Sequence, residues 1–354
     1  MRRQSSMPLV SLAVAAFAVS AATGFPQLVA PREDLVTARK GPLSRVVIAR
    51  DPQAVRFYDP QPDRVRHMME RGILELTQTS TLAAAWGKFV RPADIVAIKI
   101  NTAAGPTLST RRPVVEAVIA GLRAAGVPAH HIIIWDRSAD NLVLVGWDIR
   151  REGEGPFCYA TLPHGGWDPD TYYQTPHVGM LIWGDQEFGS RELSERSYYA
   201  RIVSKTATKL INIPVLMDNR HVGISGCLHN IAIGSVDNNR RFQTEALHFD
   251  PGIAELCARP PISGKLVLNI LDALIAQCAG GPTFQPRAAW SPGEIYLSRD
   301  PVALDALGLE AIEQRRKDAG MPPIGERARH VRIAAEIKVG VADRARMDIV
   351  EFNP

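Results

Sequence analysis

The sequence predicts an α/β fold in which a mainly parallel sheet carries helices on both faces. The clearest support comes from residues 95–136, where an apolar strand, a Gly/Pro/Thr loop, a helix over 112–126 and a second apolar strand follow one another. Parallel neighbours need a crossover between them, usually a helix, so this order indicates a βαβ unit. Further apolar strands follow after residue 208, and these extend the predicted sheet.

The other predicted elements continue the pattern on both sides of this unit. Apolar residues recur at helical spacing between 62 and 76, and Asp300 with Pro301 forms a helix start. Strands are predicted at 45–50, 209–213, 266–271, 294–298 and 347–352, and helices at 301–318 and 328–337. Residues 141–191 are predicted to be an irregular insertion rich in glycine, proline and aromatic residues. Residues 45–354 are therefore predicted to form a single α/β domain with this insertion.

The first residues have the composition of a targeting signal. Arg2 and Arg3 precede a short apolar stretch that contains small residues suited to cleavage, so residues 1–22 are predicted to be a signal peptide. The stretch is too short for a comfortable membrane span, and the arginine pair favours twin-arginine export over the general route. Residues 23–44 are predicted to be a linker. We therefore expect a periplasmic or otherwise exported protein with no membrane span in the mature chain.

Composition narrows the classes of function. The chain has 354 residues, 46% of them apolar and 22% charged, and a formal net charge of +4, as in ordinary globular proteins. Because the arginines are scattered rather than gathered on one face, we predict no nucleic-acid partner. The four cysteines are widely spaced and form no C-x-x-C, so the chain contains no ferredoxin-type iron–sulfur motif.

The stretch 212–237 is the strongest candidate for a site. It places His221, Cys227 and His229 among three glycines. Imidazole and thiolate are the ligands that transition metals prefer in proteins, so these three residues are predicted to bind such a metal. The glycines would let the backbone approach a ligand closely.

A second interpretation of the same stretch is an anion site. Cys227 is predicted to begin a helix, and the backbone N–H groups at a helix start bind anions readily. A phosphate or carboxylate could then lie against Gly226 and Cys227, with Lys99 and Arg220 nearby and Asn230 as a further polar contact. The sequence leaves the metal and anion interpretations open.

Polar residues also stand at the ends of several predicted strands. Lys99 and Asn101 end one strand, Asp136 ends the next, and Asp272 ends a later one. Ligands of open α/β sheets bind at the carboxyl ends of the strands, so these residues are expected to converge. Lys99 would either bind an anionic substrate group or orient Asp136, with an edge position as the structural alternative. Asp136 or Asp272 would orient the substrate or act as a base.

The order of several motifs resembles the family known as domain of unknown function 362. IVAIKIN with a Gly/Thr-rich loop, KLINIPVL, HVGISGCLHN, LDAL with GGP, and DPVALDALG together span about 95–309. The resemblance implies an α/β domain, export of some members by twin-arginine signals, and no general activity. Met217, Asp218 and His229 stand where the family often has lysines, which weakens the anion interpretation and favours a metal.

Two hypotheses of function follow. The leading one is a metal-assisted or redox-related enzyme that acts on a small anionic substrate at the strand ends. The alternative is a non-catalytic periplasmic protein that holds a cofactor, metal or anion, or supports maturation, together with a protein partner. The candidate residues are Lys99, Asp136 and Asp272 for catalysis, Asn101, Arg220, Gly226 and Asn230 for substrate binding, and His221, Cys227 and His229 for metal binding.

Overall fold

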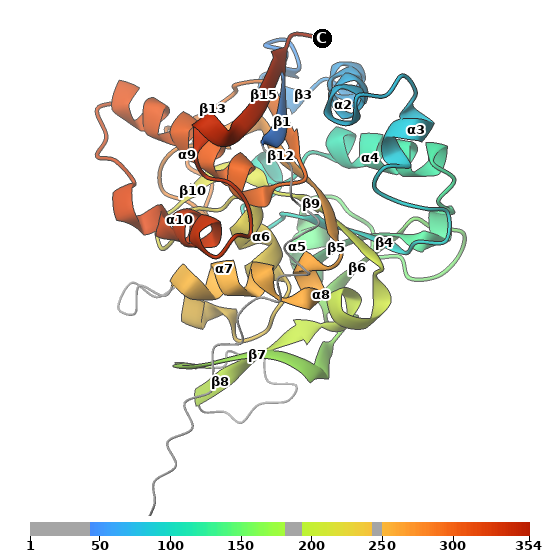
Figure 1. The fold of residues 1–354 in the computed structure, drawn as a ribbon, viewed down its shortest axis with the longest axis vertical. Coiled ribbons are helices and arrows are strands. Elements are labelled where there is room, and N and C mark those ends of the chain that lie inside the picture. The colour runs from blue at the N-terminus through green and yellow to red at the C-terminus, as the bar shows by residue number, and fades with distance from the viewer. Residues whose placement is uncertain (1–42, 181–192, 243–249) are drawn as a thin grey trace, which may run out of the picture.

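The structure is a computed structural model that describes residues 43–180, 193–242 and 250–354 (Figure 1). The predicted signal peptide (1–22) and all but the last two residues of the predicted linker (23–44) lie outside the described residues. Among the residues that are described, no helix combines the length and the apolar character needed to cross a membrane.

A large, mainly parallel sheet forms the centre of the molecule. Its main path is β15 (Met347–Phe352), β1 (Ser44–Arg50), β14 (Glu294–Ser298), β12 (Leu266–Gln277), β9 (Lys209–Ile213), β4 (Val96–Ile100), β5 (Ile132–Ser138) and β6 (Phe157–Leu162). Strand β14 is antiparallel to both its neighbours, and the other neighbours on this path are parallel. Off this path, β10 (Val215–Asn219) lies parallel to β12, while β11 (Gly223–Ile224) and β13 (Ala289–Trp290) form short antiparallel pairs.

This arrangement places the carboxyl ends of most strands on the same side of the sheet. Because β14 is antiparallel to both β1 and β12, β1 runs parallel to β12 and therefore also to β9, β4 and β5. The connections that follow β1, β4, β5, β10 and β12 therefore leave the sheet on the same side, which we call the carboxyl edge. Ligands of α/β sheets bind on this side.

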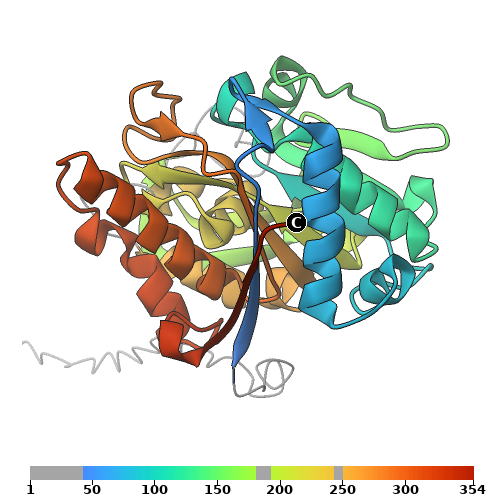
Figure 2. The ribbon, with the colours of Figure 1, turned by 90° about the horizontal axis from the view of Figure 1, so that it is seen from above.

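Helices cover both faces of the sheet (Figure 2). On one face lie α2 (Pro62–Thr77), α3 (Leu82–Trp86) and α4 (Arg112–Ala124), and on the other α6 (Cys227–Gly234), α7 (Asp250–Ala258), α9 (Pro301–Asp318) and α10 (Arg329–Glu336). Along β4, Val96, Ile98 and Ile100 join the first core, whereas Ala97 joins the second. Alternation along the strand then places Lys99 on the second face, beneath α6. The predicted fold class is confirmed.

Local sequence signals account for the element ends that matter here. Asp300 caps α9, because its carboxylate accepts hydrogen bonds from the backbone N–H groups of Val302 (2.9 Å) and Ala303 (3.1 Å), and Pro301 takes the first helical position. The shorter elements are α5 (Ala139–Leu144), α8 (Pro260–Ser263), β2 (Val55–Arg56) and β3 (Asp59–Pro60).

The prediction that residues 141–191 are irregular is wrong for the part that the structure describes, which ends at residue 180. It contains β6, which extends the main sheet beside β5, and β7 (Trp167–Met180), which pairs with β8 (Leu193–Ala200) in an antiparallel hairpin. Trp167, Tyr173 and Tyr199 are buried in the core of the second face. The aromatic residues therefore anchor the hairpin to the domain.

Candidate functional site

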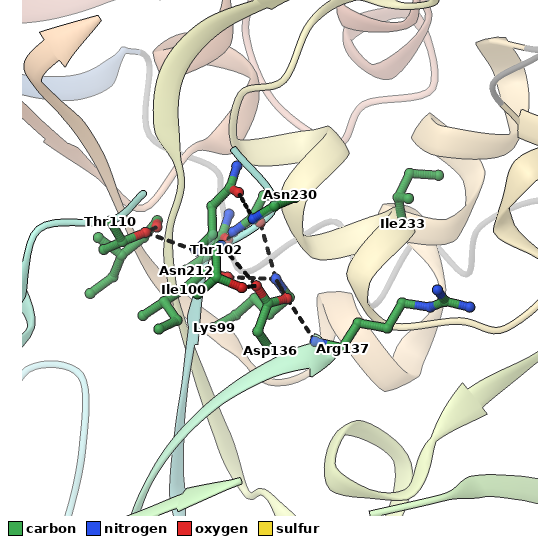
Figure 3. Close-up of polar contacts among 12 residues, drawn as sticks. Lys99, Ile100, Thr102, Thr110, Asp136, Arg137, Asn212, Asn230 and Ile233 are labelled. Carbon is green, nitrogen blue, oxygen red and sulfur yellow. Dashed lines mark hydrogen bonds and ion pairs between the residues drawn. The ribbon is translucent and has the colours of Figure 1, made fainter. Parts of the chain in front are cut away.

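A buried ion pair joins the ends of β4 and β5. Lys99 Nζ lies 2.8 Å from Asp136 Oδ1, and the same ammonium donates to the Ile100 carbonyl oxygen (2.6 Å) and to Asn230 Oδ1 (3.1 Å; Figure 3). An ammonium group has three donors, so all of them have acceptors within the protein. The Lys99 side chain is only 2% exposed. Of the two predicted roles, the structure shows Lys99 orienting Asp136 and leaves no donor for a substrate.

Asp136 is equally saturated with hydrogen bonds. One carboxylate oxygen accepts from the Thr102 backbone N–H (2.9 Å) and hydroxyl (2.5 Å), and the other accepts from Lys99 and from the Arg137 backbone N–H (2.7 Å). These four donors occupy the acceptor sites of a carboxylate. Asp136 therefore fixes the start of the 101–111 connection and the end of β5. A role as catalytic base does not fit, because no oxygen is left to accept a substrate proton.

A row of amides continues from the ion pair across the sheet. Lys99, Asn212 and Asn269 are direct neighbours in the registers of β4, β9 and β12. Asn230 donates to Asn212 Oδ1 (2.8 Å; Figure 3), and Asn212 donates to Asn269 Oδ1 (3.0 Å). A Cβ on Gly234 would lie 2.2 Å from Lys99 Cε, so α6 packs directly on the lysine. Asn230, predicted to bind substrate, instead joins α6 to this row.

The start of α6 does not offer the predicted anion site. Asp305, which is fully buried on α9, accepts hydrogen bonds from the backbone N–H groups of Cys227 and of Leu228 (2.9 Å). A Cβ on Gly226 would lie 2.1 Å from Asp305 Oδ1. A carboxylate of the protein therefore occupies the position beside Gly226 where the predicted substrate anion would lie, and anion binding by Gly226 stays a prediction.

Burial gives Asp305 an unusual proton affinity. Desolvation raises the pKa of its carboxyl to about 7, against the opposing effect of the hydrogen bonds from Leu228 and Cys227. Between about pH 4 and pH 7 the folded protein then holds a proton that the unfolded chain has released. Such a group favours the folded state at low pH, and this contribution is lost as the pH rises through 7.

Replacement of Asp305 by asparagine tests this assignment. The variant loses part of the cap on α6 and also the titrating group. We expect the stability of the wild type relative to Asp305→Asn to increase by at least about 1 kcal/mol as the pH falls from 7.5 to 5. Urea unfolding of both proteins at the two pH values measures this difference. A difference that stays constant with pH would show that Asp305 does not titrate in this window.

The predicted metal ligands are not assembled into a site. Burial and Asp305 raise the pKa of the Cys227 thiol well above its usual value, so the thiol stays protonated and hydrogen-bonds to Asp305. His221 follows β10, where its Nε2 accepts from the exposed Arg220 (3.2 Å), and His229 lies within α6. Within residues 43–180, 193–242 and 250–354, no group of three or more His, Cys, Asp or Glu side chains is arranged to hold a metal ion.

Asp272 and Asn101 shape the connection between β4 and α4. Asp272 is fully buried and accepts from the backbone N–H groups of Arg111 (2.8 Å) and Leu274 (3.1 Å). Burial raises the pKa of this carboxyl, and the nearby Arg111 opposes the rise. Asn101 Oδ1 accepts from the Ala103 N–H (3.1 Å). Both residues therefore hold the 101–111 connection in place, and Asp272 is too deeply buried to contact a ligand directly.

Arg137 is a strand-end residue to which the sequence interpretation assigned no role in the site. It follows Asp136 at the end of β5, and Figure 3 shows its side chain pointing away from the ion pair. The guanidinium carbon lies 5.7 Å from the centroid of the Trp167 ring. The residue is half-buried, and its Nε and Nη2 atoms are buried from solvent. Its position after the apolar run IIIWD was the signal that could have identified it.

The charges around Arg137 favour an anion. Burial lowers the pKa of its guanidinium to about 10, while Asp237 and Asp136 act to raise it and Arg240 acts to lower it. Counted among the described residues, Arg137, these three groups and Lys99, which pairs with Asp136, comprise three cations and two carboxylates. A small anion beside Arg137 would balance the excess positive charge, and guanidinium groups bind carboxylates and phosphates with two parallel hydrogen bonds.

Comparisons with known proteins identify a family and a distant structural neighbour. The chain is similar to a Thermotoga maritima protein whose crystal structure came from a structural genomics consortium, with 11% identity and a TM-score of 0.40. The match covers 74% of this chain and spans 60% of the length of that structure. No curated protein matches the chain. The family model described as "Domain of unknown function (DUF362)" matches residues 96–310, which is more than half of the chain and includes every site residue described above. The chain therefore belongs to the DUF362 family.

Proposed function

We propose that this protein binds a small anionic molecule at the carboxyl edge of its sheet and that Arg137 supplies the charge that holds it. The observation that carries the proposal is the excess of positive charge around a half-buried arginine at the end of β5. The Lys99–Asp136 pair has a positioning role, because Asp136 fixes the backbone N–H of Arg137 (2.7 Å).

We further propose that the bound anion is the substrate of an enzyme. Strand ends of α/β sheets are where such folds place their substrates. The metal-assisted chemistry drawn from His221, Cys227 and His229 stays a prediction from the sequence, and so does the redox-related chemistry, which rests on the family resemblance and the export signal. A non-catalytic binding or maturation role is the second candidate. It is favoured by the internal hydrogen bonds that occupy Lys99 and Asp136, because these groups are then unavailable for proton transfer.

Replacement of Arg137 by glutamine tests the binding proposal. We expect the wild type to bind inorganic phosphate or a small carboxylate such as succinate, and Arg137→Gln to bind it about 10–100-fold more weakly, because a charge-assisted hydrogen bond is lost. Isothermal titration calorimetry measures both affinities. The matched control is Arg123→Gln, at the end of α4 on the opposite side of the sheet, which should bind as the wild type does. Equal affinities in all three proteins would contradict the assignment.

Export is a separate proposal that rests on the sequence of residues 1–22 alone. The arginine pair and the short apolar stretch support it. Fractionation of the native cell, followed by N-terminal sequencing of the protein, tests it. A protein found only in the cytoplasm with its first residues intact would contradict it.

A further inference from the structure

A strained aromatic turn stands on the carboxyl edge. In the hairpin of β2 and β3, Val55 pairs with Pro60 and Arg56 pairs with Asp59, so a two-residue turn joins the strands. Its residues, Phe57 and Tyr58, have φ values of 51° and 65°. Two successive positive φ angles suit Asn-Gly and are unfavourable for bulky side chains.

The turn places its first aromatic ring in solvent. Phe57 is 97% exposed and Tyr58 is 44% exposed. The Tyr58 ring packs edge-on against Phe284 from the connection after β12, with ring centroids 6.5 Å apart, which braces the turn. Figure 2 shows the blue β2–β3 hairpin and the orange connection after β12 at the same end of the molecule. Strained conformations persist where the surroundings hold them and often serve a function.

Exposed apolar side chains stand at separate points along this edge, on independent elements. Among the residues whose burial the structure describes, six large hydrophobic side chains are exposed, and four of them follow β1 or β5: Phe57, Tyr58, Val143 (59%) and Leu144 (63%). Strands β1 and β5 are five steps apart in the sheet, or about 24 Å at the usual strand spacing. One small ligand cannot touch both groups, whereas an extended surface can.

Arginines stand on the same edge. Arg56, Arg112, Arg220 and Arg287 are exposed on the connections after β1, β4, β10 and β12. The exposed carboxylates Asp59 and Asp140 offset part of this charge, and cations remain in excess. An anionic surface with an apolar interior complements this combination.

We propose that the carboxyl edge docks on a bilayer that contains anionic lipids, with Phe57 inserted among the acyl chains. Tyr58 suits the headgroup level because its ring is apolar and its hydroxyl is polar. The arginines would contact lipid phosphates. The apolar side chains are separate points rather than one contiguous patch, and a fluid bilayer accommodates such points more readily than a protein pocket does. This inference does not depend on the anion proposed for Arg137.

Vesicle co-sedimentation of the full-length protein, as it accumulates in its native compartment, tests the proposal. The vesicles contain equal parts phosphatidylglycerol and phosphatidylcholine, or phosphatidylcholine alone. We expect the wild type to bind the anionic vesicles, and the double variant Phe57→Asn/Tyr58→Gly to bind them at least about tenfold more weakly. This variant places Asn-Gly in the turn, so it should fold with an equal or higher melting temperature.

Two further variants complete the design. Leu43→Asn removes an exposed leucine (49%) just before β1, on the opposite side of the sheet, and should bind as the wild type does. Arg56→Glu/Arg287→Glu should lose binding to the anionic vesicles several-fold. A wild type that binds neither vesicle would overturn the proposal and leave a protein as the partner of the turn. Equal binding by the wild type and the Phe57→Asn/Tyr58→Gly variant would also overturn it.

Discussion

Replacement of Lys99 by methionine is expected to destabilise the fold by about 3–5 kcal/mol, because it leaves the Asp136 carboxylate buried without its counter-charge. The pair is only 2% and 10% exposed, so solvent screens it little. Asn230 also loses the donor to its side-chain oxygen. Chemical unfolding at pH 7 of the wild type and Lys99→Met measures the loss.

A control and a rescue make this result specific. Lys88 is exposed, so Lys88→Met should change stability by no more than about 0.5 kcal/mol. The double variant Lys99→Met/Asp136→Asn removes both charges and should recover part of the lost stability. If Lys99→Met were as stable as Lys88→Met, the buried ion pair would not be the support of the site that we describe.

The second large effect is expected from Gly234→Ala. The new Cβ would lie 2.2 Å from Lys99 Cε. The end of a lysine side chain can usually move aside, but here three hydrogen bonds hold the ammonium in place. We expect a loss of about 2–3 kcal/mol from this overpacking, although alanine is otherwise the better helix former.

A double-mutant cycle separates this contact from other effects of the substitution. Methionine at position 99 has no ammonium to hold it, so Lys99→Met/Gly234→Ala should lose less stability than the sum of the two single losses. Gly165→Ala is the matched control, because its new Cβ would meet the Ala160 carbonyl oxygen at an ordinary 3.4 Å. Strict additivity in the cycle would contradict direct packing of α6 on Lys99.

Much of the fold could be predicted because its signals are local. Strands over 209–213, 294–298 and 347–352 and the helix over 301–318 agree with β9, β14, β15 and α9. Continuous apolar runs and the Asp300–Pro301 start define these elements without reference to distant residues. The strands β6, β7 and β8 were missed because glycines and prolines interrupt their alternation of apolar and polar residues. The burial of their aromatic side chains depends on packing against the rest of the domain, which the local sequence does not show.

The location of the candidate site could be predicted from the sequence better than the role of each residue in it. The sequence predicted that Lys99, Asn101 and Asp136 lie at one edge of the sheet. In the structure β4 and β5 are parallel neighbours, and Lys99 pairs with Asp136 at their ends. It could not show that Asp305 would fill the anion position at α6, since the two segments are 78 residues apart and meet only through tertiary packing. Nor could it show Arg240 near Arg137, because the charge environment of an arginine depends on elements from separate parts of the chain.

The most direct test of the account is a crystal structure of the protein soaked in bromide, with an anomalous difference map. We predict a bromide ion within about 4 Å of the Arg137 guanidinium, a usual distance for an ion pair. We predict none at the start of α6, where Asp305 accepts hydrogen bonds from the N–H groups of Cys227 and Leu228. Bromide at the start of α6 with Asp305 displaced, or no bromide beside Arg137, would contradict the site that we describe.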